Sequence, residues 1–166
     1  MSQTKLAFVA SQDETALQAK RELENKYAHV PENDADVVVV LGGDGKMLEA
    51  LRYYIDKPVK VFGMNKGTVG FLMNEFSSDN LLKRIEAATL VTLHPLRMHV
   101  ETSTGIVKEA LAFNEVSLLR ETSQTAKLRI TIDGTVRMEE LLCDGILVST
   151  PWLLYTSPSP RDHEHS

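Results

Sequence analysis

Cysteine is almost absent from this sequence, in which Cys143 is the single thiol among 166 residues. One cysteine cannot form an internal disulfide, and such sparse use is typical of proteins kept in a reducing compartment. The first residues lack the apolar core of a secretory signal peptide, and no apolar run is long enough to span a bilayer. We therefore expect a cytoplasmic protein that has no membrane partner.

The sequence also lacks an excess of positive charge. It has 18 lysines and arginines against 23 aspartates and glutamates, which gives a formal net charge of -5. A chain without a basic footprint is not expected to have a nucleic-acid partner. Small phosphate-bearing ligands remain possible, because local loops and metal ions can override the net charge. The length fits about one ordinary domain or two small ones.

The strongest local pattern runs from Asp36 to Gly45. An unbroken apolar run, Val37 to Leu41, predicts a strand buried on both faces of a parallel sheet. The run ends in a turn with three glycines and one carboxylate, namely Gly42, Gly43, Asp44 and Gly45. Glycines let backbone N–H groups approach a phosphate, whereas Asp44 would repel one. Asp44 is better suited to accept a proton or to help hold a divalent cation, and the alternative is that it caps the next helix.

A second glycine-rich segment supports a ligand site. Before Asp36, the sequence predicts a strand at 6–10, then a capping box at 11–14 that starts a helix to about Tyr27. After the glycine turn, a further helix is expected at 46–54. Residues 58–62 predict a third strand, followed by a loop at 63–72 with three glycines. If these strands are parallel neighbours, both loops lie at one sheet edge and form a nucleotide cleft. The alternative is that the glycines only permit tight turns. The spacing matches neither a Walker A loop nor the Rossmann fingerprint.

The second half of the chain changes character. A short helix is expected at 80–88, capped by one of the residues 77–79, and from about Thr92 the pattern alternates with period two, as in antiparallel strands. Asn114 and Glu115 interrupt an apolar stretch, which indicates either an edge or bulge or a pair that faces a ligand. Neighbouring strand residues point to opposite faces, so both could face one ligand only near a bend. Asp144 is likewise either a turn residue or a ligand carboxylate.

Four segments together resemble bacterial NAD kinases, and the alphaproteobacterial branch in particular. The resemblance covers about residues 5 to 151 and is carried by segments 41–45, 63–72, 114–116 and 143–151. It implies transfer of the γ-phosphate of ATP to the 2′-hydroxyl of the adenosine ribose of NAD, which gives NADP. It also implies a divalent cation, usually Mg²⁺, beside ATP, and a homo-oligomer. The roles implied for single residues are general base for Asp44, dinucleotide contacts for Gly45, Asn114, Glu115 and Asp144, and the adenine side of the site for Phe71.

The expected fold class is an α/β domain with a parallel sheet, over residues 1–91, followed by an incomplete antiparallel β-sandwich, over residues 92–151. The first domain would bind nucleotide and the second NAD. No metal-ligand spacing links the histidines, so no metal ligand is predicted. After Pro151 the chain departs from the family pattern, and residues 152–166 resemble translated sequencing-adapter sequence. The alternative is a genuine, divergent C-terminus. We therefore expect a truncated kinase with a disordered, non-native tail, poorly soluble or inactive by itself.

Two other functions remain open from the sequence. The Gly-Gly-Asp-Gly turn is shared with diacylglycerol-kinase-like lipid kinases and resembles a phosphofructokinase loop. Asn114-Glu115 and the 63–72 loop argue against a lipid or sugar kinase. The second alternative is a non-catalytic module that binds a dinucleotide.

Overall fold

The computed structural model describes residues 4–67, 70 and 72–150. The chain divides into two compact units, Met1–Val91 and Thr92–Ser166, which are described here one at a time. Phe71 and the tail from residue 152 lie outside the described residues. None of the helices in the described ranges is both long enough and apolar enough to cross a membrane.

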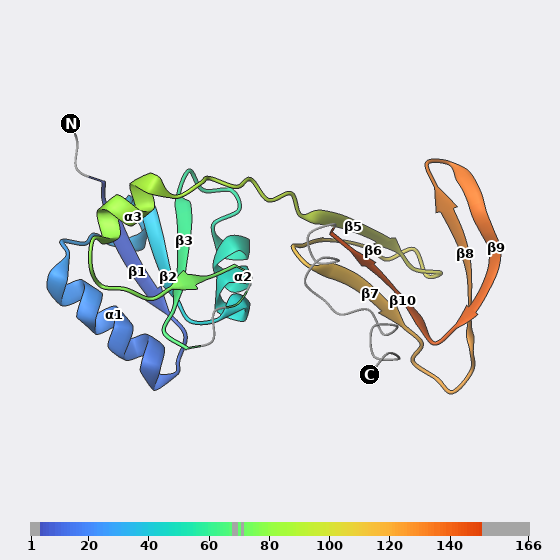
Figure 1. Ribbon diagram of the computed structural model, residues 1–166. Helices are drawn as coiled ribbons and strands as arrows, with labels where there is room; N and C mark the ends of the chain where they lie inside the picture. Colours follow the sequence, from blue (N-terminus) through green and yellow to red (C-terminus); the bar gives the residue numbers. More distant parts are fainter. Residues whose placement is uncertain (1–3, 68–69, 71, 151–166) are drawn as a thin grey trace. The chain divides into compact units, whose positions relative to one another are not determined.

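A four-stranded parallel sheet forms the centre of the first unit (Figure 1). The strand order is β1-β2-β3-β4, with β1 at Leu6–Ala10, β2 at Val37–Leu41, β3 at Lys60–Asn65 and β4 at Asn74–Glu75. All five residues of β2 are buried, because β2 has a paired strand on each side and helices on both faces. The two-face burial predicted from the valine run is confirmed.

The helices of the first unit cover opposite faces of this sheet. Alternate residues of β2 separate the two layers: Val37, Val39 and Leu41 share a core with α1 (Glu14–Lys26) and α3 (Leu81–Ala87). Val38 and Val40 pack with α2 (Asp44–Tyr53). Because α1 follows β1 and α2 follows the neighbouring β2, the chain leaves two adjacent strands toward opposite faces. A short 3-10 helix, η1 (Glu32–Asp34), precedes β2.

Three element boundaries differ from the sequence predictions. The N-cap of α1 is Asp13, which accepts a hydrogen bond from the Ala16 amide at 2.8 Å, so the box that began at residue 11 was placed two residues early. Helix α2 begins at Asp44 rather than at residue 46. Strand β3 continues to Asn65, beyond the predicted end at residue 62, because Gly63 and Met64 keep the ladder with β2.

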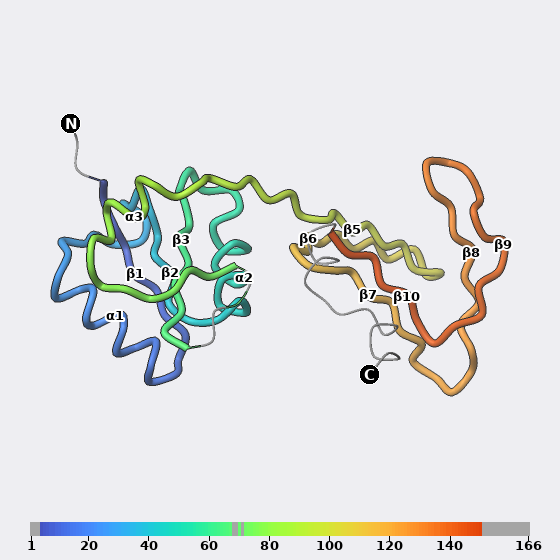
Figure 2. Tube along the Cα trace, in the orientation of Figure 1, coloured from blue at the N-terminus to red at the C-terminus, as the bar shows by residue number. Residues whose placement is uncertain are grey.

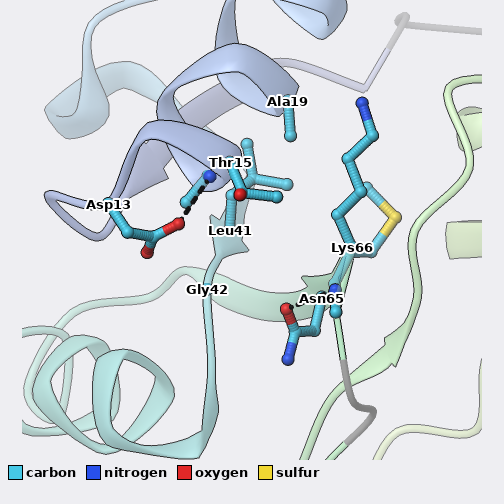
Figure 3. A pocket seen from close by; sticks show the side chains of 10 residues that line it. Asp13, Thr15, Ala19, Leu41, Gly42, Asn65 and Lys66 are labelled. Carbon is cyan, nitrogen blue, oxygen red and sulfur yellow. Dashed lines mark hydrogen bonds between the residues drawn. The ribbon is translucent and has the colours of Figure 1, made fainter.

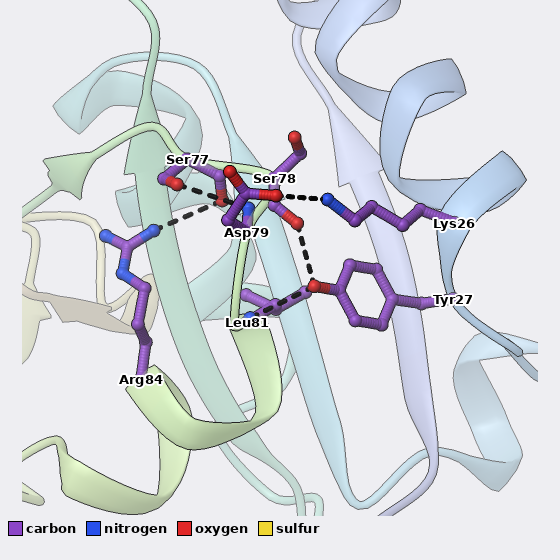
Figure 4. Close-up of polar contacts among 7 residues, drawn as sticks. All are labelled: Lys26, Tyr27, Ser77, Ser78, Asp79, Leu81 and Arg84. Carbon is purple, nitrogen blue, oxygen red and sulfur yellow. Dashed lines mark hydrogen bonds and ion pairs between the residues drawn. The ribbon is translucent and has the colours of Figure 1, made fainter.

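Polar contacts join the start of α3 to the end of α1 (Figure 4). The Tyr27 hydroxyl donates to the Ser78 carbonyl at 2.7 Å and accepts from the Leu81 amide at 3.1 Å. Lys26 pairs with Asp79, and the Arg84 guanidinium donates to the Ser77 carbonyl. The predicted capping of α3 by a residue from 77–79 was wrong. The N-cap is Asn80 without a side-chain hydrogen bond, and Tyr27 takes up the first amide.

The second unit consists of three antiparallel strand pairs, traced in Figure 2. They are β5–β6, β7–β10 and β8–β9, with strands at Leu96–Glu101, Val107–Ala112, Glu115–Leu119, Ala126–Ile132, Thr135–Cys143 and Gly145–Ser149. The β8–β9 hairpin is inserted between β7 and β10. Its turn has positive φ at both Asp133 and Gly134, as a type I′ turn requires, so the hairpin predicted at this Asp-Gly pair is confirmed. The predicted fold class, α/β followed by antiparallel β, is confirmed as well.

Burial in the second unit is slight. Among its described residues, only Phe113 and Thr150 are buried. Large apolar side chains stay exposed on several strands, with Leu119 77% and Leu142 58% accessible.

Candidate functional site

The turn after β2 requires glycine at its first position. Gly42 has φ of 144°, in the region that favours glycine, and a Cβ there would lie 2.6 Å from the Ser11 hydroxyl oxygen. At Gly43 and Gly45, by contrast, an added Cβ would meet nothing within 4 Å. The backbone conformation and the contact with Ser11 therefore account for glycine at position 42. The space beside Gly43 and Gly45 is open to a ligand.

Asp44 is the first residue of α2 and is half-buried. Its Oδ1 accepts a hydrogen bond from the Leu72 amide at 3.1 Å. A Cβ added to Gly70 would lie 2.4 Å from each carboxylate oxygen of Asp44, so the backbone at Gly70 packs directly on the carboxylate. The N-cap position, which the alternative interpretation gave to Asp44, belongs to Gly43. The second glycine-rich segment thus holds the Asp44 side chain in place.

Both glycine-rich segments lie at the same edge of the sheet, as predicted. Leu41 and Met64 are partners in the parallel β2–β3 ladder, and the Gly42 amide donates to the Met64 carbonyl at 3.2 Å. This is the carboxyl edge, where open α/β sheets bind their ligands. The contact between Asp44 and Leu72 extends the junction beyond the strands.

A cavity of about 170 Å³ opens at this edge, on the α1 face (Figure 3). Thr15 and Asp13 lie on the α1 side, and Asn65 and Lys66 face them from the end of β3. Apolar side chains line the rest, including Ala16, Ala19 and Leu41. Gly42 borders the cavity and belongs to the same turn as Asp44. The sequence interpretation missed this cavity, because residues 11–14 indicated only a helix start.

The charged groups at the cavity rim are mixed in sign. A hydrogen bond from the Ser11 hydroxyl, and a second from the Ala16 amide, hold the pKa of Asp13 below its ordinary value. The Lys66 ammonium lies 3.3 Å from the Glu22 carboxylate and 4.9 Å from the centre of the Phe76 ring. With one carboxylate and one ammonium among the lining side chains, the cavity is suited to an uncharged polar group with an apolar face.

The predicted ligand pair of the second unit lies at a bend. Asn114 is half-buried between β6 and β7, and the exposed Glu115 is the first residue of β7. The Asn114 Oδ1 atom is buried and has no hydrogen-bond partner among the residues that the structure describes. A buried acceptor without a donor is unfavourable, so this oxygen is ready to accept a hydrogen bond.

Asp144 lies at the other end of the same strand pair. Its carboxylate is 2.6 Å from the Arg120 Nε, and its carbonyl accepts from the Arg120 amide at 2.9 Å. In the β7–β10 ladder Glu115 pairs with Ser149, whereas Leu119 pairs with Gly145, beside Asp144. At the usual rise of a strand, Asn114 and Asp144 are roughly 20 Å apart. The structure therefore brings Asn114 and Glu115 together and places Asp144 apart from them.

Comparison with known proteins identifies the family. Residues 1–92 match the ATP-NAD kinase N-terminal domain. The chain belongs to the NAD kinase family. The match covers the sheet of the first unit, the turn at Asp44 and the segment that holds it. This membership confirms the resemblance that the four sequence segments indicated.

Relatives with curated names are NAD kinases of alphaproteobacteria, as the sequence resemblance predicted. The chain is 53% identical to the NAD kinase of Hyphomonas neptunium, over 91% of this chain and 59% of the relative. It is 52% identical to that of Brucella suis, over 91% and 60%, and 53% identical to that of Caulobacter vibrioides, over 89% and 57%. The chain thus spans about three fifths of the length of these relatives.

A solved structure supports the fold. The crystal structure of yeast NADH kinase complexed with NADH aligns with a TM-score of 0.70 and 19% identity. The alignment covers 90% of this chain and 58% of the yeast chain. At this identity, the likeness establishes a shared fold.

The fit of a divalent cation depends on few protein atoms. In the described part of the chain, no three acidic, histidine or cysteine side chains gather as a metal site. Magnesium in phosphate-transferring sites is held mainly by phosphate oxygens and water, with one or two carboxylates. Asp44 is the carboxylate that the turn offers, so this donor set fits such an ion.

Proposed function

We propose that the site around Asp44 serves the kinase reaction of the family, in which ATP phosphorylates the 2′-hydroxyl of the adenosine ribose of NAD to give NADP. The observation that carries this proposal is the placement of Asp44. It begins a helix at the carboxyl edge of a parallel sheet and accepts the Leu72 amide, while Gly70 packs against its carboxylate. Residues 1–91 would bind the nucleotide donor and residues 92–151 the NAD.

Asp44 would act as the general base. A ribose hydroxyl is a weak nucleophile until a base accepts its proton, and a positioned base contributes typically about 10²–10⁴-fold. The hydrogen bond from Leu72 uses one lobe of the carboxylate, Oδ1. That bond fixes the orientation of the group that would accept the proton.

The phosphates of ATP would lie over Gly43 and Gly45, where the backbone is open. The N-terminus of α2 favours negative charge at this point. The magnesium ion would neutralise charge on the phosphates during transfer. The adjoining cavity, with its mixed charge and apolar lining, would hold the uncharged nucleoside part of the donor.

NAD would be contacted by Asn114 and Glu115, with Gly45, Phe71 and Asp144 as further contacts. The free Oδ1 of Asn114 supports this part of the proposal, because a ribose hydroxyl or the adenine amino group can donate to it. A homo-oligomer and a cytoplasmic location complete the proposal. The free thiol of Cys143 is compatible with a reducing compartment.

The test measures NADP formed by the purified chain from ATP, magnesium and NAD. We expect Asp44→Asn to lower the rate by at least about 100-fold, since it removes the proton acceptor. Asp56→Asn changes an exposed aspartate of the same unit and should leave the rate unchanged. Near-normal turnover of the Asp44→Asn variant would remove Asp44 from the mechanism.

If the chain by itself turns over too slowly, calorimetric titration with NAD and with ATP tests recognition separately. Failure to bind either ligand would contradict the proposal for this chain. NAD binding without turnover would favour the non-catalytic dinucleotide-binding module. Family membership argues against the lipid kinase, and a panel with NAD, diacylglycerol and fructose 6-phosphate checks that directly.

A further inference from the structure

Thr150 forms hydrogen bonds to the bend at residues 113–114. Its hydroxyl lies 3.0 Å from the Phe113 carbonyl oxygen and 3.2 Å from the Asn114 carbonyl oxygen, and can donate to either. Its backbone N–H donates to the Asn114 carbonyl at 2.9 Å. Thr150 follows β10 directly, so these bonds continue the β7–β10 ladder by one position past the Ser149–Glu115 pair.

Because Thr150 is buried, the loss of its hydrogen bonds would be unfavourable. The Thr150 residue is only 2% exposed, and a buried hydroxyl needs a partner. At the bend, the Phe113 carbonyl lies outside the strand ladders and needs a donor from elsewhere, whereas the Asn114 carbonyl is reached by the extended β7–β10 ladder. The Thr150 side chain supplies one and its backbone another. Phe113, itself 6% exposed, anchors the same bend in the core.

The bend decides how Asn114 and Glu115 are presented. In a straight strand their side chains would point to opposite faces, and one ligand could not meet both. The chain bends at residues 113–114, before β7 begins at Glu115. The Asn114 Oδ1 atom is left buried without a donor, while the Asn114 backbone is held by Thr150.

We infer that Thr150 is a positioning residue for dinucleotide recognition: its hydroxyl holds the Phe113–Asn114 bend so that Asn114 and Glu115 face the same NAD molecule. This inference rests on the proposed function, because it concerns the NAD contacts named there. Thr150 touches the backbone of the bend, and its effect on NAD passes through Asn114.

A purely structural role for Thr150 predicts different behaviour. Phe113 and Thr150 are the two buried residues of the described second unit, so losing Thr150 could simply loosen that unit. Such loosening would depend on side-chain volume, and valine preserves the volume. A positioning role depends on the hydroxyl, which serine preserves and valine removes.

The experiment compares Thr150→Val and Thr150→Ser by calorimetric titration with NAD and with ATP, using the full 166-residue chain. We expect Thr150→Val to weaken NAD binding about tenfold, as the loss of a buried hydrogen bond does. Thr150→Ser should stay within about twofold of wild type, and ATP binding should be unchanged in both. Thr102→Val is the matched control, because its hydroxyl accepts the Ile106 amide in a separate turn of the same unit.

A double-variant cycle tests whether Thr150 acts through Asn114. If it does, adding Thr150→Val to Asn114→Ala should weaken NAD binding by less than Thr150→Val weakens it in the wild type, because only Glu115 is left to be misplaced. Fully additive losses would overturn the inference. Unchanged NAD affinity in Thr150→Val, or an equal loss in Thr150→Ser, would overturn it as well.

The remaining outcomes are also decisive. If Thr150→Val does not fold, amide hydrogen exchange of the wild-type chain replaces it, and an unprotected Thr150 amide would overturn the inference. If the wild-type chain binds ATP but not NAD, the proposed NAD recognition fails, and the inference fails with it. If the wild-type chain and Thr150→Val bind NAD equally well, the inference about Thr150 fails while the proposed function stands.

Discussion

The Oδ1 atom of Asp44 accepts a hydrogen bond from the backbone amide of Leu72, over 3.1 Å and 28 residues of sequence. The amide belongs to the segment that follows β3, whereas Asp44 begins the helix that follows β2. Gly70 lies against the same carboxylate, at a separation that leaves no room for a side chain. The second glycine-rich segment therefore acts as a support for the proposed base.

Replacing Gly70 tests this support. In Gly70→Ala, the new Cβ would overlap both oxygens of Asp44, so the carboxylate must move. We expect NADP formation to fall about 100-fold, the scale of loss when a reacting group is misplaced by about 1 Å. Asp56→Ala is the control, because Asp56 is an exposed residue of the same unit outside both glycine-rich segments. Full activity of Gly70→Ala would show that the contact does not position the base.

Closing the cavity beside Gly42 tests the proposed donor site. Thr15 is exposed on α1 and lines the cavity, so Thr15→Trp should fill it without disturbing the core. We expect ATP binding to weaken about tenfold or more, while NAD binding is kept, because the indole occupies the space of the nucleoside. Gln18→Trp places the same ring on an exposed position of α1 outside the cavity lining. Equal ATP affinities in the two variants would exclude the cavity as the donor site.

The cap of α1 makes a pH-dependent contribution to stability. Hydrogen bonds from Ser11 and Ala16 lower the pKa of Asp13 below its ordinary value of 3.8. A carboxyl with a lowered folded-state pKa stabilises the fold fully above the ordinary value, and its contribution is lost as the pH falls through the folded-state pKa. Urea unfolding of Asp13→Ala and wild type should therefore differ at pH 7 and converge in acid.

Asp56→Ala serves as the control for the cap, since Asp56 is exposed and outside the cap. It should unfold like wild type at both ends of this pH range. A gap between Asp13→Ala and wild type that stays constant down to strong acid would show that the carboxylate charge is not involved.

Local sequence patterns were sufficient for most elements. The valine run predicted a strand buried on both faces because β-branched residues without alternation have no polar face to expose. The Asp133-Gly134 pair predicted a hairpin because Asp and Gly tolerate the positive φ of a tight hairpin turn, which both positions have. Period-two alternation located the antiparallel strands of the second half. These features depend on residues close together in the chain.

Features that depend on contacts between distant residues could not be predicted from the sequence. Tyr27 caps a helix that begins 54 residues later, and nothing near residue 80 announces it. The strand at Asn74–Glu75 is two residues long and shows no period of its own. The cavity is built from the start of α1 and the ends of β2 and β3, and no single segment signals it. The Thr150 contacts likewise join residues 36 or 37 positions apart.

The sequence by itself determined the strands, the glycine turn with its single carboxylate, and the family resemblance, because each rests on residue types at short spacing. Only the tertiary structure decided what surrounds that carboxylate. Sheet register brings Met64 beside Leu41, and the segment that follows Met64 thereby returns to Asp44. There the Leu72 amide donates a hydrogen bond to the carboxylate, and Gly70, which has no side chain, packs against it. Such contacts come from packing between elements, whose geometry the linear order of residues does not express.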